Sequence, residues 1–177
     1  MNILYLGNLD DNNVLKYLQN NFNTISLDGL IKVDDIKNID WIISYGYKFI
    51  LKSDIIDSTL NPILNLHISY LPYNKGAYPN YWSFVNKTPK GVSIHKIEEG
   101  IDTGPIFIQK RVSYSENDTL YSFYKKLKFE IEKLFIENFK KIIDGEIRPF
   151  TQKGKGSFHK KSELPENIDW NINVNKL

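Results

Sequence analysis

Two short apolar runs, each closed by a glycine, most constrain the fold of this chain of 177 residues. Ile3–Leu6 is followed by Gly7, and Trp41–Tyr45 is followed by Gly46. Both runs have the length and composition of buried strands. Between them, apolar residues at positions 14, 15 and 18 follow helical spacing, and residues 24–27 have the length of another strand. This alternation is typical of parallel strands joined by crossover helices, so the sequence predicts an α/β fold with a mostly parallel central sheet flanked by helices.

The remaining elements extend this pattern along the chain. Ile63–His67 is predicted as a third clear strand, and Pro79 suits the first turn of a short helix that reaches Phe84. Residues 91–97 alternate in polarity like a half-exposed strand, and a further strand is expected over residues 105–109. We expect the last two strands to pair with each other.

A long helix is expected between an Asp118 cap and Gly145. Its apolar stripe consists of Leu120, Phe123, Leu127, Ile131, Leu134, Phe135, Phe139 and Ile142. A stripe with this period predicts an amphipathic helix that packs on the core. From Thr151 onward the sequence becomes polar and irregular. We therefore expect one domain over residues 1–150 and a polar tail over residues 151–177 that packs on this domain or extends from it.

Composition excludes several classes of function. The sequence contains no cysteine, which rules out thiolate catalysis, cysteine-ligated zinc and disulfide bonds. The formal net charge of +2 is too small to indicate a nucleic-acid or membrane partner. No apolar stretch approaches the ~20 residues needed to cross a bilayer, and the N-terminus resembles a first strand rather than a leader. We expect a soluble, cytoplasmic protein.

Asn65 and His67 stand two residues apart at the end of a predicted strand. Side chains at this spacing point to the same face of a strand, so an amide and an imidazole would lie side by side. The end of an open parallel sheet is also where ligands usually bind. Such a pair supplies a hydrogen-bond donor and a proton acceptor. The same two residues also fit a turn cap and a buried, hydrogen-bonded imidazole, and the pair alone does not decide between these interpretations.

Asp102 lies in a later turn with a glycine on each side, at positions 100 and 104. The glycines allow the backbone to approach a flat ligand closely, and a carboxylate brought to the imidazole would orient it. An aspartate that caps a turn is the alternative interpretation. The three side chains together would suit proton transfer and stabilisation of a developing oxyanion without a covalent nucleophile.

The sequence motifs in the middle of the chain, and the order in which they occur, resemble those of the folate-dependent formyltransferase family. The resemblance rests on Asn65-Leu66-His67-Ile68-Ser69, Leu71-Pro72-Tyr73-Asn74-Lys75-Gly76, the pair Pro79 and Trp82, and Gly100-Ile101-Asp102-Thr103-Gly104-Pro105. The family includes glycinamide ribonucleotide transformylase, methionyl-tRNA formyltransferase and sugar N-formyltransferases. Its usual Asn-x-His-Pro-Ser pattern departs here at one position, where Ile68 replaces the proline.

The resemblance implies a Rossmann-like formyltransferase fold for residues 1–150 and 10-formyltetrahydrofolate as formyl donor. Asn65, His67 and Asp102 would then be the catalytic residues, with Asp102 raising the pKa of the His67 imidazole above its ordinary value of ~6.5. The donor pocket would consist of Tyr47, Lys48, Phe49, Ile50, Leu51, Glu98, Gly100, Ile101 and Asp102. The acceptor would contact Gly76, Tyr78, Pro79 and Trp82. Aromatic side chains of that region, including Tyr73 and Tyr81, would stack on the acceptor or pack over the sheet.

The acceptor is predicted mainly by exclusion. Only 73 residues follow the Asp102 turn, which leaves little room for an RNA-binding domain. The turn after the first strand carries Asp10 and Asp11, which would repel the phosphate of glycinamide ribonucleotide. We therefore expect a primary amine on the amino-deoxysugar of a nucleoside-diphosphate sugar, and a short sugar N-formyltransferase that forms a homodimer. Alternatives are a formyltetrahydrofolate hydrolase, a glycinamide ribonucleotide-type enzyme, and a catalytically idle folate- or nucleotide-binding module.

Two further histidines are given structural roles. His95 lies inside an alternating strand and is expected to be a surface or cross-strand residue. His159 lies in the polar tail, where solvation is favoured over contact with a substrate phosphate. Three histidines at these spacings predict no metal site.

Overall fold

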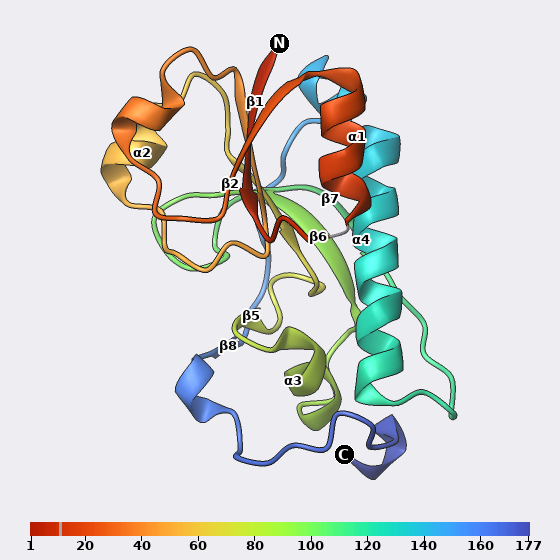
Figure 1. Cartoon of the computed structure of the whole chain (residues 1–177). Helices are drawn as coiled ribbons and strands as arrows, with labels where there is room; N and C mark the ends of the chain where they lie inside the picture. Colours follow the sequence, from red (N-terminus) through yellow and green to blue (C-terminus); the bar gives the residue numbers. More distant parts are fainter. Residues whose placement is uncertain (11) are drawn as a thin grey trace.

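The computed structural model describes residues 1–10 and 12–177, and it contains a mixed sheet of six strands in the order β2-β1-β3-β4-β6-β7 (Figure 1). The first four strands in this order run parallel, whereas β6 is antiparallel to β4 and β7 is antiparallel to β6. Their bounds are Asn2–Gly7 (β1), Asn23–Leu27 (β2), Trp41–Tyr45 (β3), Leu64–His67 (β4), Gly91–Lys96 (β6) and Ile106–Arg111 (β7). The predicted α/β fold, with its mostly parallel sheet and the pairing of the last two strands, is confirmed.

Helices cover both faces of the sheet. On one side α1 (Asn13–Asn21) lies beside α4 (Leu120–Ile143), and Figure 1 shows the two in contact along the sheet. On the opposite side lie the 3₁₀ turn η1 (Val33–Ile36) and the short helix α2 (Ser53–Asp57). Alternate residues of β1 and β3 point to opposite faces, so each central strand contributes to two apolar clusters, one under α1 and α4 and one under α2.

The N-cap of the long helix lies one residue later than predicted. Thr119 is the N-cap, and its hydroxyl accepts a hydrogen bond from the Ser122 N–H at 3.1 Å. Asp118 precedes the cap, and its carboxylate accepts from the Ser115 N–H at 2.7 Å and from Lys126 Nζ at 2.6 Å. The prediction of Asp118 as the cap is therefore wrong by one position. Thr119 accepts the hydrogen bond from the backbone N–H of the first helical turn, so the Asp118 carboxylate is available to connect the preceding loop to the helix. Gly145 follows the last turn with a positive φ of 75°, as predicted for the helix end.

Strand β6 is buried on both faces, which contradicts the half-exposed strand predicted for residues 91–97. It lies between β4 and β7 and packs against α4. Its polar residues Ser93 and His95 are fully buried and hydrogen-bonded. The alternation in the sequence therefore separates an apolar face from a buried polar face, not from solvent.

Residues 151–177 follow an extended path over the lower half of the molecule in Figure 1. Strand β8 (Phe158–His159) pairs in parallel with β5 (Lys75–Gly76) in a small second sheet. The 3₁₀ turns η2 (Lys161–Glu163) and η3 (Val174–Lys176) follow, and Asn173 bridges to Thr119 at the start of α4. The division into a domain over residues 1–150 and a tail over residues 151–177 stays a prediction. Within the described residues, no helix is long and apolar enough to cross a membrane.

Candidate active site

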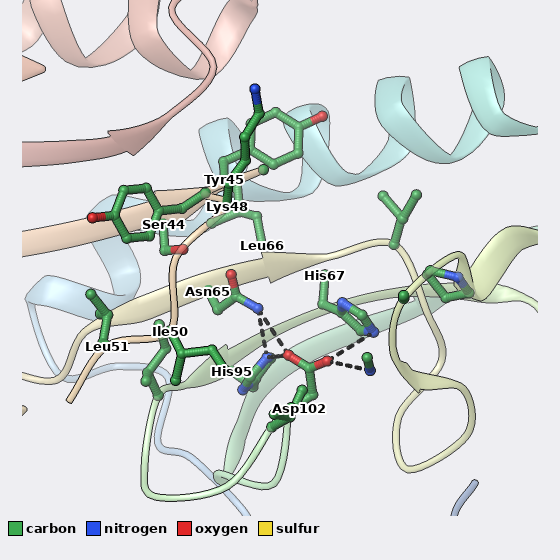
Figure 2. A pocket seen from close by; sticks show the side chains of 18 of the residues that line it. Ser44, Tyr45, Lys48, Ile50, Leu51, Asn65, Leu66, His67, His95 and Asp102 are labelled. Carbon is green, nitrogen blue, oxygen red and sulfur yellow. Dashed lines mark hydrogen bonds and ion pairs between the residues drawn. The ribbon is translucent and has the colours of Figure 1, made fainter. Parts of the chain in front are cut away.

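Asp102 lies at the centre of a cluster of polar side chains at the end of β4 (Figure 2). Its Oδ1 accepts a hydrogen bond from Asn65 Nδ2 at 3.2 Å and lies 3.4 Å from His95 Nε2. Its Oδ2 lies 3.6 Å from His67 Nε2 and accepts a hydrogen bond from the Gly76 N–H at 2.8 Å. One carboxylate therefore contacts both imidazoles and the amide, and it joins β4, β5 and β6 at one point.

Two paired strands set the positions of the other three side chains. Asn65 and His67 point to the same face of β4 because they are two residues apart. His95 is the direct partner of Asn65 in the antiparallel ladder between β4 and β6. Directly opposed residues of such a ladder have neighbouring side chains, and His95 Nε2 lies 3.0 Å from Asn65 Nδ2.

The turn that carries Asp102 is held by its backbone conformation, by hydrogen bonds to its carbonyl oxygens and by close packing. Asp102 has a positive φ of 53°, a left-handed conformation that aspartate tolerates better than most residues. Gln152 Nε2 donates hydrogen bonds at 2.8 Å to the carbonyl oxygens of Asp102 and Gly104. Gly104 packs so tightly that a Cβ would lie 2.0 Å from the Lys96 carbonyl oxygen. Any side chain at this position would displace the turn, and the carboxylate would move with it.

The pKa of Asp102 results from opposed effects. Burial alone raises the pKa of this carboxyl, because it disfavours the charged form. The charge of His67, the contacts with His95 and the hydrogen bond from the Gly76 N–H outweigh burial and hold the pKa below its ordinary value of 3.8. Asp102 is therefore a carboxylate at neutral pH.

The pKa of His67 is shifted in the direction opposite to the one predicted. Burial lowers the pKa of the imidazole, which is only 8% exposed, while Asp102 raises it, His95 lowers it and the Asn74 carbonyl oxygen raises it. The net pKa lies below the ordinary value of 6.5, so His67 is mainly neutral at neutral pH. Asp102 raises the pKa of His67 as predicted, but the net pKa is not above 6.5, because the desolvation of the ring outweighs this effect and was not visible in the sequence.

The amide of Asn65 is oriented by its two acceptors. His95 Nδ1 lies 2.9 Å from the Lys96 carbonyl oxygen, to which it donates, and this leaves Nε2 as an acceptor in the neutral ring. The two N–H bonds of Asn65 Nδ2 then point to His95 Nε2 and to Asp102 Oδ1. Donation from Asn65 to a substrate oxygen therefore replaces one of these two hydrogen bonds.

The cluster lies on the wall of a cavity of about 950 Å³. A cavity of this volume is at the upper end of the range for small-molecule sites. It opens at the carboxyl ends of β3 and β4, the edge of the sheet where ligands bind in folds of this kind.

Comparison with known proteins identifies the fold and its family. The family model described as formyl transferase matches residues 20–139. The chain belongs to the formyl transferase family. The resemblance drawn from the motifs around Asn65, His67 and Asp102 is therefore confirmed.

The chain is similar to one solved formyltransferase over nearly its whole length and to curated methionyl-tRNA formyltransferases over part of theirs. The formyltransferase PseJ from Anoxybacillus kamchatkensis is 40% identical with a TM-score of 0.90, over 99% of this chain and 97% of that chain, and its crystal structure contains UDP-4,6-dideoxy-4-formamido-L-AltNAc and tetrahydrofolate. Methionyl-tRNA formyltransferase from Thermodesulfovibrio yellowstonii is 32% identical over 152 residues, which cover 85% of this chain and 49% of the relative. Methionyl-tRNA formyltransferase from Kosmotoga olearia is 38% identical over 110 residues, 62% of this chain and 35% of the relative. The chain thus spans about half the length, or less, of these two curated relatives.

The formyl transferase brings all of its predicted donor-binding residues to the main cavity. They form two walls, one after β3 and one between β6 and β7: Tyr47, Lys48, Phe49, Ile50, Leu51, Glu98, Gly100, Ile101 and Asp102. The side chains of Phe49, Ile50 and Ile101 are exposed although they are apolar. Exposed apolar groups that line a cavity are a surface that a flat ring system would cover.

The predicted acceptor residues of the formyl transferase are separated. Gly76 and Pro79 line the main cavity, whereas Tyr78 lines a second cavity that Pro79 also reaches. Trp82 lines neither of these two cavities of the described chain. It stacks instead on His159, with ring centroids 4.1 Å apart and ring planes at 9°.

His95 is the site residue that the sequence prediction missed. It was expected to be a surface or cross-strand residue, and only the cross-strand part is right, because its side chain is 1% exposed and contacts Asn65 and Asp102. The one feature that could have identified His95 is its position opposite Asn65, and this position is known only once the register of the β4–β6 ladder is known. Neither the register nor the burial of the polar face of β6 is encoded in local periodicity.

The tail also contributes more than the sequence predicted. His159, Lys160 and Lys161 line the main cavity of the formyl transferase, whereas a solvated tail had been favoured for His159. The stack on Trp82 and the hydrogen bond between Asn86 Nδ2 and His159 Nε2, 3.0 Å, hold this segment at the site. Within residues 1–10 and 12–177, no group of three or more histidine, aspartate and glutamate side chains is arranged to hold a metal ion.

Proposed function

We propose that this formyl transferase moves a formyl group from 10-formyltetrahydrofolate to the primary amine of an amino-deoxysugar that is carried by a nucleoside diphosphate. The observation that carries the proposal is the cluster of Asn65, His67 and Asp102 on the wall of a cavity of about 950 Å³. The 40% identity to PseJ over 97% of that chain supports an acceptor of this class. A cytoplasmic location and a homodimer stay predictions.

The reaction requires one proton transfer and stabilisation of one charge. The donor supplies an activated formyl group, so no covalent enzyme intermediate is needed. The amine nitrogen bonds to the formyl carbon, the bond from this carbon to N10 breaks, the amine loses a proton, and N10 takes up a proton. During the attack the formyl oxygen becomes negative and requires a hydrogen-bond donor.

His67 is assigned the role of general base. Its lowered pKa keeps the imidazole neutral at neutral pH, which is the form that accepts a proton. Its Nε2 lies near two acceptors, the Asn74 carbonyl oxygen at 3.3 Å and Asp102 Oδ2 at 3.6 Å, which favours the hydrogen on Nε2. In this tautomer the lone pair of Nδ1 is the one that receives the amine proton.

Asp102 is assigned an orienting and electrostatic role. Its pKa lies below its ordinary range, so it does not carry a proton at neutral pH. The carboxylate stabilises His67 once the imidazole has gained a proton, and it fixes β5 through the Gly76 N–H. This division of work between base and carboxylate is common in proton-transfer sites.

Asn65 is assigned the hydrogen bond to the developing oxyanion. A single donor of this kind contributes about 3 kcal/mol to transition-state stabilisation. His95 has no direct part in the reaction in this assignment. It acts as a positioning residue because its Nε2 accepts from Asn65 Nδ2 and so sets the orientation of the amide.

The donor fits the wall formed by residues 47–51 and 98–102. Phe49, Ile50 and Ile101 present exposed apolar surface to the cavity, and a pterin ring would cover such surface. The acceptor then occupies the opposite side, between Gly76 and the segment His159–Lys161.

The test is the consumption of 10-formyltetrahydrofolate by the full chain in the presence of single acceptors. UDP- and dTDP-linked 4-amino and 3-amino deoxysugars, glycinamide ribonucleotide, methionyl-tRNA and water alone are compared, with mass spectrometry of the products. We expect turnover only with an amino-sugar nucleotide, accompanied by a product heavier by one formyl group. Turnover in water alone, or only with one of the other two amines, would reject the proposed acceptor.

A further inference from the structure

A second cavity of about 410 Å³ adjoins the main one and is lined mostly by aromatic rings. It lies between helix α3 (Pro79–Val85), the first turns of α4 and the C-terminal segment, which Figure 1 shows passing close to both helices. Its lining consists of Ile68, Tyr78, Pro79, Asn80, Tyr81, Tyr121, Tyr124 and Trp170. The reaction assigned above uses none of the rings in this set.

The two cavities are continuous. Ile68, Pro79 and Tyr124 line both of them. Tyr124 and Lys128 are four residues apart on α4 and so lie on the same face of this helix, and Lys128 lines the main cavity. A ligand that binds near Gly76 can therefore extend past Lys128 and Tyr124 into the second cavity.

The aromatic rings of the second cavity remain accessible. Tyr121, Tyr124 and Trp170 are exposed, although large aromatic side chains are usually buried. The rings of Tyr78 and Trp170 lie 6.0 Å apart at an interplanar angle of 32°. The backbone of Trp170 is held in place because its carbonyl oxygen accepts from the Tyr121 N–H at 2.9 Å. Exposed rings on a fixed backbone around a hollow are suited to stacking on a flat heterocycle.

Asn80 adds a hydrogen-bond acceptor to this cavity. Its Nδ2 donates to the Leu120 carbonyl oxygen at 2.7 Å, which fixes the orientation of the amide. Its Oδ1 is buried and accepts no hydrogen bond from the described residues, and the residue is only 4% exposed. Buried polar atoms are almost always paired, and Asn80 lines this cavity, so its acceptor is available to a ligand group that donates. The N3–H of uracil and thymine is such a group, and cytosine lacks it.

Positive charge lies in the main cavity, which adjoins the second one. Lys128, Lys160 and Lys161 line the main cavity, and none of them forms an ion pair with a carboxylate of the described residues. Three unpaired ammonium groups in the adjoining cavity complement the charges of a diphosphate.

From these observations we infer that the second cavity binds the uracil or thymine base of the acceptor, while the diphosphate lies near Lys128, Lys160 and Lys161. The inference rests on the proposed function, because it assigns the nucleotide part of the acceptor. It makes Trp170 a residue that determines affinity for the nucleotide without touching the reacting atoms.

The test measures the binding of UDP, dTDP, CDP and N3-methyluridine 5′-diphosphate to the full chain by isothermal titration calorimetry. Trp170→Ala removes one stacking ring, Trp170→Phe keeps an aromatic ring, and Phe129→Ala is the matched control. Phe129 is also exposed, but it lies on α4 outside both cavities. The unmodified chain tests the hydrogen bond of Asn80 through the two ligands that lack an N3–H, so no variant of this buried residue is needed.

We expect Trp170→Ala to weaken UDP binding by about tenfold or more, Trp170→Phe to restore part of the affinity, and Phe129→Ala to leave it unchanged. UDP or dTDP should bind at least about tenfold more tightly than CDP and the N3-methyl nucleotide. An unchanged UDP affinity in Trp170→Ala, in a chain that still formylates an amino-sugar nucleotide, overturns this inference and leaves the proposed function standing. A wild-type chain that neither binds these nucleotides nor formylates the amino-sugar nucleotides overturns both.

Discussion

His67 is held neutral at neutral pH although a carboxylate oxygen lies 3.6 Å from its Nε2. Burial lowers the pKa of the ring by more than Asp102 raises it, and the neighbouring His95 lowers it further. The site thus combines a base in its unprotonated form with a carboxylate that stabilises the protonated form as it appears. This combination suits an amine that loses its proton while it attacks.

Removal of the Asp102 charge should shift the acid limb of the pH profile to lower pH. Asp102 raises the pKa of His67, so the Asp102→Asn variant should have a still lower His67 pKa and, with less stabilisation of the imidazolium, a lower kcat. The measurement is kcat/KM against pH for both chains. Glu137→Gln is the control, because it removes an exposed carboxylate of α4 that lies outside both cavities. An acid limb that moves to higher pH in Asp102→Asn would contradict the assignment of His67.

Truncation of Asn65 should act on turnover more than on donor binding. Asn65→Ala removes the donor assigned to the oxyanion, and loss of one such donor lowers kcat by about 100- to 1000-fold. Tetrahydrofolate binding should stay within a few-fold, as measured by titration. Asn138→Ala, on α4 and away from both cavities, should retain full activity. Full turnover by Asn65→Ala would remove this residue from the reaction.

Among the secondary-structure elements, the start of α4 is held to the loop that precedes it by the side chain of Asp118. Asp118 accepts hydrogen bonds from the Ser115 N–H and the Ser122 hydroxyl and pairs with Lys126. Burial raises the pKa of Asp118, but the contacts with Lys126, Ser115 and Ser122 prevail and lower it to about 2. The carboxylate form is thus favoured by folding, and α4 and its preceding loop are stabilised together.

Replacement of Asp118 by asparagine should lower the free energy of unfolding by about 1–2 kcal/mol at pH 7. Because the folded-state pKa lies below the ordinary value of 3.8, this contribution is fully present above pH 4 and is lost as the pH falls through 2. Urea unfolding at pH 7 and at pH 2 measures the difference. Glu116→Gln, an exposed acid of the same loop, should change stability little at either pH. A difference that stays the same at both pH values would contradict a role for the Asp118 charge.

Secondary-structure elements could be predicted where the local pattern of apolar and polar residues determines them. The alternation of β4 placed Asn65 and His67 on one face, and the apolar stripe from Leu120 to Ile142 defined α4. The burial of His95 was not predictable, because it depends on the register between β4 and β6 and on the elements that cover β6. The shift of the α4 cap from Asp118 to Thr119 depends on which of two adjacent capping residues finds its partner.

At the scale of the whole molecule, the site forms where segments distant in sequence meet. The turn after β3, the end of β4, the Asp102 turn, one face of α4 and the segment around β8 all line one cavity. The first two could be assigned to one place because β3 and β4 are parallel and their carboxyl ends share an edge. The Asp102 turn follows the antiparallel strand β6, and it was assigned to the site by the resemblance to the family. The last two could not, since the path of the tail depends on its pairing with β5 and on the stack between Trp82 and His159.

Transfer of the formyl group can be followed with a label carried by 10-formyltetrahydrofolate. The full chain is mixed with this labelled donor and with an amino-sugar nucleotide, and released tetrahydrofolate, labelled formate and labelled sugar nucleotide are quantified together. We expect each tetrahydrofolate released to be matched by one labelled formamido sugar nucleotide, and we expect Asn65→Ala to suppress both products equally. Release of tetrahydrofolate with labelled formate and no labelled sugar nucleotide would contradict it.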